Sequence, residues 1–200
     1  MKSITRRTLL AGCVAAPLAS SVAWKQNARA TTAPRGPRAD YFPNVVLRTQ
    51  ENNPVRFYDD LIADKIVMIN FMYAHCERLC PTQTANLVKV QHILGERVGR
   101  DIFMYSLTLK PEEDTPQVLK QYADSFNIGP GWLFLTGKPD DVELLRQKLG
   151  FVDVDPVLDR DKSQHVGMVL YGNETRDRWS ACPALSEADL IAKYVTWMGV

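Results

Sequence analysis

A cluster of reactive side chains lies in the seven-residue stretch HCERLCP, residues 75–81. It contains Cys76 and Cys80, with His75 before the first cysteine and Pro81 after the second. A thiolate is both the nucleophile of thiol–disulfide exchange and a soft metal ligand. The stretch can therefore form a disulfide switch or hold a metal ion, and it can also simply bury two thiols.

The spacing of the cysteines favours a metal without excluding a disulfide. Redox pairs of the thioredoxin type have two intervening residues, whereas three residues separate Cys76 from Cys80. This wider loop can close a disulfide or hold two sulfurs around a metal. Two thiolates suit linear Cu(I), and an added imidazole makes a trigonal set that can also hold Cu(II). A structural zinc site more often has four protein ligands, and a fourth is not evident.

Three histidines could supply an imidazole. His92 falls off the apolar stripe of its expected helix, so we predict a solvated side chain. His75 is adjacent to Cys76, and neighbouring side chains in an extended segment point in opposite directions, so joint ligation would be strained. His165 lies in the polar stretch 159–168, which could fold over the cysteines. Residue types alone leave its role as a ligand open.

Apolar strands alternate with amphipathic helices along the chain, which predicts an α/β layered domain with a partly parallel sheet. Two short strands are expected around the polar turn 50–53. Further strands are expected over residues 65–73, 101–109, 132–136 and 166–172, and helices from residue 81 and over 114–126, 138–150 and 186–198. The cysteine loop then follows the carboxyl end of a central strand, the edge where open α/β sheets place their chemistry.

The helix ends carry capping signals and affect the thiols. Asp114 or Thr115 can cap the second long helix, and Ser186 with Asp189 forms a capping-box pattern in the last one. Cys76 precedes a helix and Cys80 lies at or just inside its first turn. Backbone N–H groups and the helix dipole favour negative charge there, so we expect both thiols to have a lowered pKa.

Residues 1–30 have the plan of an export signal, and Arg6-Arg7 before an apolar run indicates the twin-arginine type, which directs proteins to the periplasm. Cleavage is expected after Ala30, followed by a flexible leader over 31–40 and one domain over 41–200. An uncleaved inner-membrane anchor over 8–24 and lipidation at Cys13 are alternatives.

Cleavage would remove five of the 24 basic residues and no acidic one, which leaves 19 basic and 23 acidic residues and a net charge of −4. This balance argues against nucleic acid as a partner. Of four cysteines, three would remain in an oxidising compartment. The third, Cys182, is either a small buried side chain or a resolving thiol.

Four blocks of the chain resemble, in order, the Sco/SenC family of copper-binding thioredoxin-like proteins. They are VMINFMYAHCERLCPTQTANLVKVQ, SLTLKPEEDTPQVLKQYADSF, GWLFLTG and KSQHVGMVLYGNE. The match extends from about residue 41 to 198, and its most specific parts are the C-x-x-x-C-P motif and the single downstream histidine.

The resemblance implies a thioredoxin-like fold, with a central mixed sheet flanked by helices and an N-terminal strand hairpin. It also implies that Cys76, Cys80 and His165 bind one copper ion in either oxidation state. The family serves assembly of the copper A centre of cytochrome c oxidase, by delivering copper or by reducing the target's cysteines. Expected partners are a copper-accepting subunit of a respiratory oxidase or another copper enzyme, and a thiol reductant or copper donor.

This chain departs from the family at several points. Where the family commonly has DPERDTP, the sequence is KPEEDTP, so Lys110 replaces an aspartate near the expected site. Many members have a transmembrane anchor, whereas this chain is expected to be exported. Cys182 is an additional cysteine.

These patterns lead to a metallochaperone hypothesis, in which no substrate is turned over, and to a thiol–disulfide oxidoreductase hypothesis. In the second, Cys76 attacks a disulfide, Cys80 resolves the intermediate and His165 is dispensable. A peroxide-reducing enzyme would need a T-x-x-C arrangement that the sequence lacks. A disulfide that only staples the loop would explain neither the helix-end position nor the proline.

Overall fold

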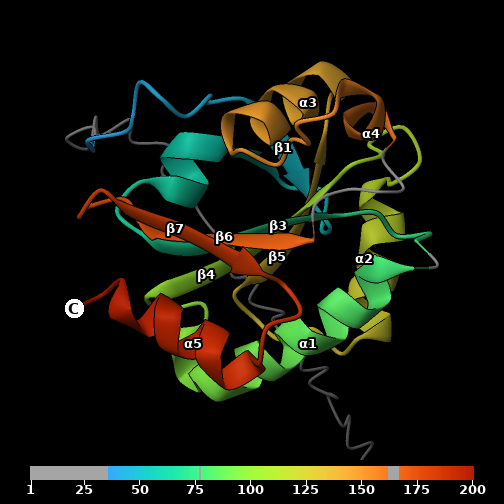
Figure 1. Cartoon of the computed structure of the whole chain (residues 1–200). Coiled ribbons are helices and arrows are strands. Elements are labelled where there is room, and N and C mark those ends of the chain that lie inside the picture. The colour runs from blue at the N-terminus through green and yellow to red at the C-terminus, as the bar shows by residue number, and fades with distance from the viewer. Residues whose placement is uncertain (1–35, 77, 162–166) are drawn as a thin grey trace, which may run out of the picture. The chain divides into compact units, whose positions relative to one another are not determined.

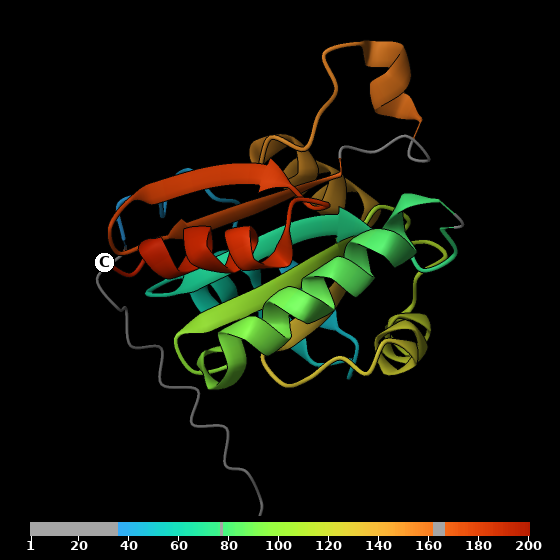
Figure 2. The same ribbon diagram turned by 60° about the horizontal axis from the view of Figure 1, so that its bottom comes forward.

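The computed structural model describes residues 36–76, 78–161 and 167–200. These residues form a mixed sheet with helices on both faces (Figures 1 and 2). The strands are β1 (Val46–Thr49), β2 (Pro54–Arg56), β3 (Ile66–Met72), β4 (Ile102–Thr108), β5 (Trp132–Gly137), β6 (Met168–Asn173) and β7 (Arg178–Pro183). Their order in the sheet is β2-β1-β5-β4-β3-β6-β7.

Only the central strands pair in parallel among the described residues. β3, β4 and β5 run side by side in the same direction, and β1, β6 and β7 add to them in antiparallel pairs. β1 and β2 form the expected N-terminal hairpin. The predicted α/β layers with partly parallel pairing are thus confirmed.

The helical segments are η1 (Phe57–Ile62, π-helical), α1 (Leu79–Leu94), η2 (Gly95–Arg97, 3₁₀), α2 (Pro116–Ser125), α3 (Pro139–Lys148), α4 (Pro156–Arg160) and α5 (Ala188–Trp197). α1 and α5 lie side by side on one face of the sheet (Figure 2). The stacked rings of Tyr171 in β6 and Tyr194 join α5 to this face. On the other face, Phe151 after α3 packs on Phe71 of β3, with ring centroids 4.8 Å apart.

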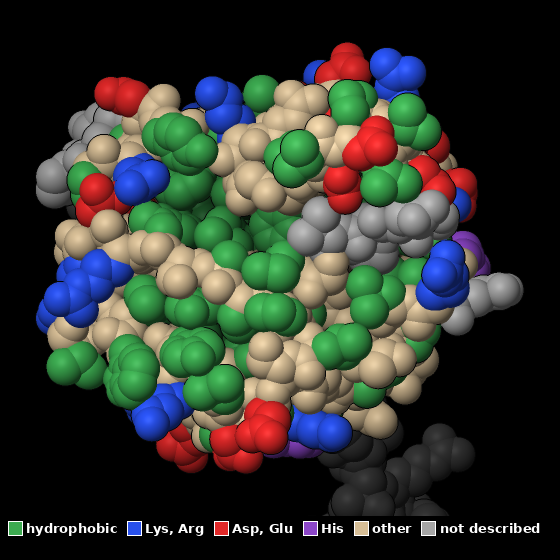
Figure 3. All heavy atoms as spheres, in the orientation of Figure 1, with side chains coloured by type: hydrophobic (Ala, Val, Ile, Leu, Met, Phe, Trp, Pro, Cys, Tyr) green, Lys and Arg blue, Asp and Glu red, His purple; other side chains and the backbone are tan. Residues whose placement is uncertain are grey.

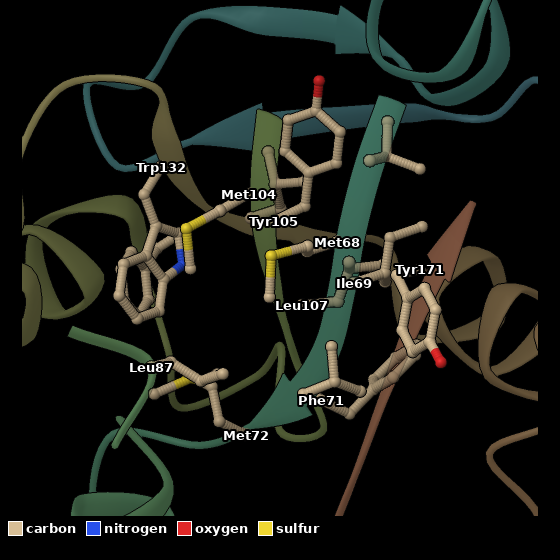
Figure 4. Packing of buried hydrophobic residues seen from close by; sticks show 14 of the residues in the cluster. Met68, Ile69, Phe71, Met72, Leu87, Met104, Tyr105, Leu107, Trp132 and Tyr171 are labelled. Atoms are coloured by element: carbon tan, nitrogen blue, oxygen red, sulfur yellow. The ribbon is translucent and has the colours of Figure 1, made fainter. Parts of the chain in front are cut away.

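β3 is the centre of the hydrophobic core. Each of its seven residues is buried, and Figure 4 shows side chains such as Met72 and Phe71 leaving it on opposite sides. Burial on both faces explains why the strand is an almost continuous apolar run in the sequence. The strand predicted over 65–73 is confirmed.

A buried hydrogen-bond chain links the three parallel strands inside this core. Ser106 of β4 donates to the Asn70 side-chain oxygen of β3 at 2.8 Å and accepts from the Trp132 indole of β5 at 2.9 Å. A polar group is costly to bury without a partner, and these bonds pair the Ser106 hydroxyl, the Trp132 indole and the Asn70 side-chain oxygen. The chain therefore holds the register of the strands that lead to the site.

Several boundaries differ from those expected. α1 begins at Leu79 rather than at residue 81, and β7, α4 and η1 were not predicted. The capping box was wrong, because α5 begins at Ala188 and its N-cap is Glu187, with no side-chain cap bond. In α2 the cap is Thr115, whose side chain accepts from Val118 N–H. Asp114 instead turns into the interior.

The first described residues are bonded to the body of the domain. Gly36 N–H donates to the Tyr58 hydroxyl at 2.9 Å, and Arg38 N–H donates to the Glu174 carboxylate at 3.1 Å. The signal expected over 1–30 and Cys13 lie outside the described residues. Within the part of the chain that the structure describes, no helix is long and apolar enough to span a membrane.

Candidate metal centre

The cysteine loop leaves the carboxyl end of β3 and is held there by backbone and side-chain bonds. Leu109 N–H donates to the Met72 carbonyl at 2.8 Å, and Cys76 N–H closes a turn onto the Tyr73 carbonyl at 3.3 Å. Helix α1 starts three residues after Cys76, so Cys80 is its second residue. This strand–loop–helix arrangement is the one that the sequence predicted.

Both cysteines are buried and are not joined in a disulfide, with exposed fractions of 5% for Cys76 and 0% for Cys80. The Cys80 backbone N–H points at the Cys76 sulfur, 3.4 Å from nitrogen to Sγ. The two thiols also interact directly through their side chains. Two adjacent sulfurs shielded from water form a donor set suited to a soft cation such as Cu(I), and they can also form a disulfide.

The two thiols differ sharply in acidity. Burial opposes ionisation of Cys76, but hydrogen bonds from the Cys80 thiol, from the Cys80 and Arg78 N–H groups and from the Tyr73 hydroxyl outweigh it and lower its pKa. Burial, together with the neighbouring Cys76, raises the pKa of Cys80. The expectation of a lowered pKa is wrong for Cys80. Its side chain is fully buried beside Cys76, and it is Cys76 that accepts the Cys80 and Arg78 N–H groups at the helix start.

Tyr73 and Lys110 extend the site on one side. Burial, together with the bond to Cys76, raises the pKa of Tyr73 to about 12, so its hydroxyl stays protonated and can donate to sulfur. The Lys110 ammonium lies over the Tyr73 ring, 4.7 Å from its centroid. The sequence pointed to Lys110 as a departure from the family, but nothing in it singled out Tyr73 within an apolar strand end.

Asp114 holds the start of the cysteine loop through a hydrogen bond from Ala74. This carboxylate is 1% exposed and accepts from the Thr108 hydroxyl at 2.5 Å and from Ala74 N–H at 3.1 Å. Burial raises its pKa, while these two bonds and the charge of His75 oppose the shift. The sequence suggested only a capping role for Asp114. Its inward position depends on the turn between β4 and α2, which sequence patterns do not specify.

The segment before β6 borders the same loop. β6 runs antiparallel to β3, with Ile66 opposite Asn173 and Ile69 opposite Leu170, so it enters the sheet at the edge where β3 leaves. Gly167 packs closely against Leu79, which lies between the two cysteines in the sequence. A Cβ atom added to Gly167 would be 2.7 Å from Leu79 Cδ2. His165, the third predicted ligand, lies outside the described residues.

The other candidate residues take no part in this cluster. His92 is exposed on α1, which confirms the predicted solvated side chain, and His75 is exposed beside the loop. Cys182 is buried in β7 opposite Val169, and burial raises its pKa. It forms no disulfide in the structure. Across residues 36–76, 78–161 and 167–200, no group of three or more His, Cys, Asp or Glu side chains could hold a metal ion.

Known proteins resemble this chain in sequence. A sequence model of the SCO1/SenC family matches residues 41–196. The SCO2-like protein of Rickettsia prowazekii is 29% identical over 98 residues, which cover 49% of this chain and 46% of that protein. The SCO1 homologue of Bacillus subtilis is 32% identical over 75 residues, 36% of this chain and 38% of the relative. The matched stretch therefore spans less than half the length of these two relatives.

Solved structures share the fold. A SCO1/SenC family lipoprotein from Bacillus anthracis superposes with a TM-score of 0.66 at 20% identity, over 80% of this chain and 95% of that one. Bradyrhizobium japonicum ScoI with copper bound superposes with a TM-score of 0.62 at 22% identity, over 76% of this chain and 96% of that one. BsSco superposes with a TM-score of 0.62 at 21% identity, over 77% of this chain and 90% of that one. It is a member of the Sco family of cytochrome c oxidase assembly proteins and is described as having a disulfide switch.

The similarity to these structures agrees with the mixed sheet and flanking helices described above. The thioredoxin-like layered fold expected from the sequence is confirmed, with a mixed sheet flanked by helices. The family match covers most of the domain, including the C-x-x-x-C-P motif. This chain belongs to the SCO1/SenC family.

Proposed function

We propose that this protein is a periplasmic metallochaperone that binds one copper ion, as Cu(I) or Cu(II), through Cys76, Cys80 and His165. It delivers copper to a respiratory copper site such as the copper A centre of cytochrome c oxidase, or reduces the thiols of that site. Its partners are the copper-accepting subunit and a copper donor or thiol reductant. The proposal is supported by family membership, by the copper bound to Bradyrhizobium japonicum ScoI and by the place of BsSco among cytochrome c oxidase assembly proteins.

The observation that carries the proposal is the pair of adjacent, buried sulfurs at the carboxyl edge of β3. Their acidities suit the loading of a soft cation. Cys76, with a lowered pKa, gives up its proton more readily than an ordinary thiol, whereas Cys80, with a raised pKa, keeps its proton until a cation displaces it.

A role for His165 is supported by its described neighbours. Gly167, two residues after it, lies against Leu79 in the cysteine loop. Asp161, at the other end of the intervening segment, is close enough to Tyr73 to influence its pKa. Both flanks of the segment therefore lie near residues that adjoin the cysteines, Leu79 and Tyr73, so a short span of chain suffices to bring an imidazole to the sulfurs.

The test is a copper titration of the reduced protein beside His165→Ala and His92→Ala. We expect a one-to-one complex whose Cu(II) form has sulfur-to-copper charge-transfer bands and a matching electron spin resonance spectrum. His165→Ala should lose these bands, and His92→Ala, which removes an exposed imidazole from α1, should keep them. Copper binding that is weak and indifferent to His165 would contradict the three-ligand site.

A thiol–disulfide oxidoreductase is the second candidate, favoured by the lowered pKa of Cys76 beside a second thiol. The Cys76 thiolate would attack a target disulfide to form a mixed disulfide and release one target thiol. Cys80 would then attack the Cys76 sulfur, release the second target thiol and leave a Cys76–Cys80 disulfide, so that two electrons pass to the target. A His165→Ala variant with full reductase activity and no copper dependence would support this candidate.

Export is the remaining part of the proposal. Residues 1–30 act as a twin-arginine signal cleaved after Ala30, 31–40 form a leader, and 41–200 form the domain. Mass spectrometry of the protein recovered from the periplasm tests this directly. A mature chain that begins at Thr31 is expected. Recovery of the full chain in the inner membrane, or of a lipidated Cys13, would replace it with an anchored form.

A further inference from the structure

Lys110 is connected to the cysteine pair through one aromatic ring. Its ammonium lies 4.7 Å from the centroid of the Tyr73 ring, well within the range of about 6 Å for a cation–π contact. Tyr73 is buried, and its hydroxyl is hydrogen-bonded to the Cys76 sulfur. The contacts therefore run from a cation, through a ring, to one sulfur of the pair.

The turn after β4 fixes the position of this lysine. Lys110 N–H donates to the Thr108 hydroxyl at 2.9 Å, and its carbonyl accepts from Glu113 and Asp114 N–H at 3.0 and 2.9 Å. The ammonium also contacts the Glu113 carboxylate at 3.4 Å. Because both the backbone and the ammonium group of Lys110 are bonded, its side chain is positioned over the Tyr73 ring.

We propose that Lys110 is a positioning residue of the cysteine site, which acts through Tyr73 to favour the reduced Cys76–Cys80 dithiol over the disulfide. The inference rests on the proposed role of the cysteine pair. A cation above a phenol ring holds the ring in place and draws electron density from it, which makes the hydroxyl a stronger donor. A reduced sulfur accepts such a bond better than a disulfide sulfur, since it carries more negative charge.

A direct effect of the Lys110 charge on the sulfurs would be weaker than the effect through Tyr73. About a third of its side chain is exposed, at 34%, and its charge is offset by Glu113 at 3.4 Å. Solvent and an adjacent carboxylate screen a charge at longer range. The ring contact is different, because Tyr73 is buried and borders Cys76. The effect therefore passes through Tyr73.

The test measures the redox equilibrium of the copper-free protein with glutathione. Two glutathione thiols give up two electrons and two protons and join in one disulfide, while the Cys76–Cys80 bond breaks and its two sulfurs take them up. Mass spectrometry after acid quenching and alkylation counts the reduced form. Cys182→Ser in every variant removes the third described thiol, and Cys13→Ser removes the one in the signal region.

Lys110→Met should shift this equilibrium about threefold toward the disulfide, the size expected for an exposed cation–π contact. At 29.6 mV per tenfold change, this is about 14 mV more negative in reduction potential. Lys110→Arg should restore the wild-type value, because a guanidinium also stacks on a ring. Tyr73→Phe should itself favour the disulfide, and adding Lys110→Met to it should cause no further shift.

Lys120→Met is the matched control, since it removes an equally charged, exposed lysine from α2 and should leave the potential unchanged. The inference is overturned if Lys110→Met matches the wild type, if the shift persists in the Tyr73→Phe background, or if no Cys76–Cys80 disulfide forms. Because no copper is present, a failed copper titration contradicts the proposed function without contradicting this inference.

Discussion

Two cysteines four residues apart acquire opposite acidities in this protein. Cys76 accepts hydrogen bonds at the start of α1, and its pKa is lowered, whereas Cys80 is fully buried beside it, and its pKa is raised. At Cys76 the hydrogen bonds outweigh burial, whereas at Cys80 burial and the neighbouring Cys76 outweigh the backbone bonds. Residue type and spacing alone would assign both thiols the same chemistry.

At the same scale, Asp114 gives a pH-dependent prediction. Asp114→Asn keeps a side-chain oxygen for Thr108 and Ala74, so the fold should be retained. Burial raises the folded-state pKa of Asp114 above the unfolded value of about 3.9. The folded wild type therefore binds this proton more tightly, and its free energy of unfolding falls as pH rises between the two pKa values.

The stability of Asp114→Asn relative to the wild type should accordingly increase over that window, by about 1.4 kcal/mol for each unit by which the pKa is raised. Urea unfolding of both proteins from about pH 3.5 to about pH 7 measures the difference. Asp114→Ala, which leaves Ala74 N–H and the Thr108 hydroxyl without this acceptor, should cost about 1–3 kcal/mol. A difference between the wild type and Asp114→Asn that is constant with pH would refute the assignment.

At the scale of elements, α4 is held to α3 by one buried arginine. The Arg146 side chain is 5% exposed and binds Asp159 of α4 with two bonds of 2.6 and 2.7 Å. It also binds Glu143 and the Phe151 carbonyl. Figure 2 shows α4 standing out from the layers, and Val154 and Val157 are 100% and 74% exposed. Apolar burial therefore contributes little to its position.

Arg146→Met should detach α4 while leaving the sheet intact. Removing the guanidinium deprives the Asp159 carboxylate, which is 24% exposed, of its two bonds to Arg146, at a cost of about 1.5–3 kcal/mol. Arg146→Lys should rescue little, because an ammonium cannot reproduce the two-bond fork to Asp159. Amide hydrogen exchange should accelerate over residues 152–160 and remain slow in β3. Unchanged protection of α4 in Arg146→Met would show that other contacts hold it.

At the scale of the whole molecule, residues distant in sequence converge on the cysteine helix. Asn86 of α1 donates to the carbonyls of Ala184 and Ser186 at 2.9 and 2.8 Å, and Ala184 N–H donates to the Gly167 carbonyl at 2.8 Å. Gly167 in turn lies against Leu79.

On the face in Figure 3, acidic and basic side chains are spread around the rim, and hydrophobic side chains occupy much of the centre.

Gly167→Val tests this convergence. An added Cβ would lie 2.7 Å from Leu79 Cδ2, the end of a flexible side chain, so Gly167→Ala should be tolerated. The extra methyl groups of valine should overpack the contact and cost about 1–3 kcal/mol. Leu79→Ala should recover part of this cost in the double variant, with a coupling of at least about 0.5 kcal/mol by urea unfolding. Strictly additive effects would mean that the two residues are not in contact.

Much of the fold is readable from local patterns, for definite reasons. A strand buried on both faces needs an unbroken apolar run, which Ile66–Met72 supplies, and Thr115 with Pro116 marks the start of α2. The elements that were missed lack such signals. β7 is largely exposed, with only Cys182 buried, and α4 has five residues positioned by an ion pair.

The sequence alone determined the chemistry available to this protein, because residue type sets what an atom can donate, accept or ligate. Two thiols separated by three intervening residues after a buried strand already favour soft-metal or disulfide chemistry at the site. Only tertiary structure decided which thiol is acidic, that Asp114 turns inward, and that Lys110 reaches Cys76 through Tyr73. Those properties depend on burial and on contacts between β3, the turn after β4 and α1, which no local pattern encodes.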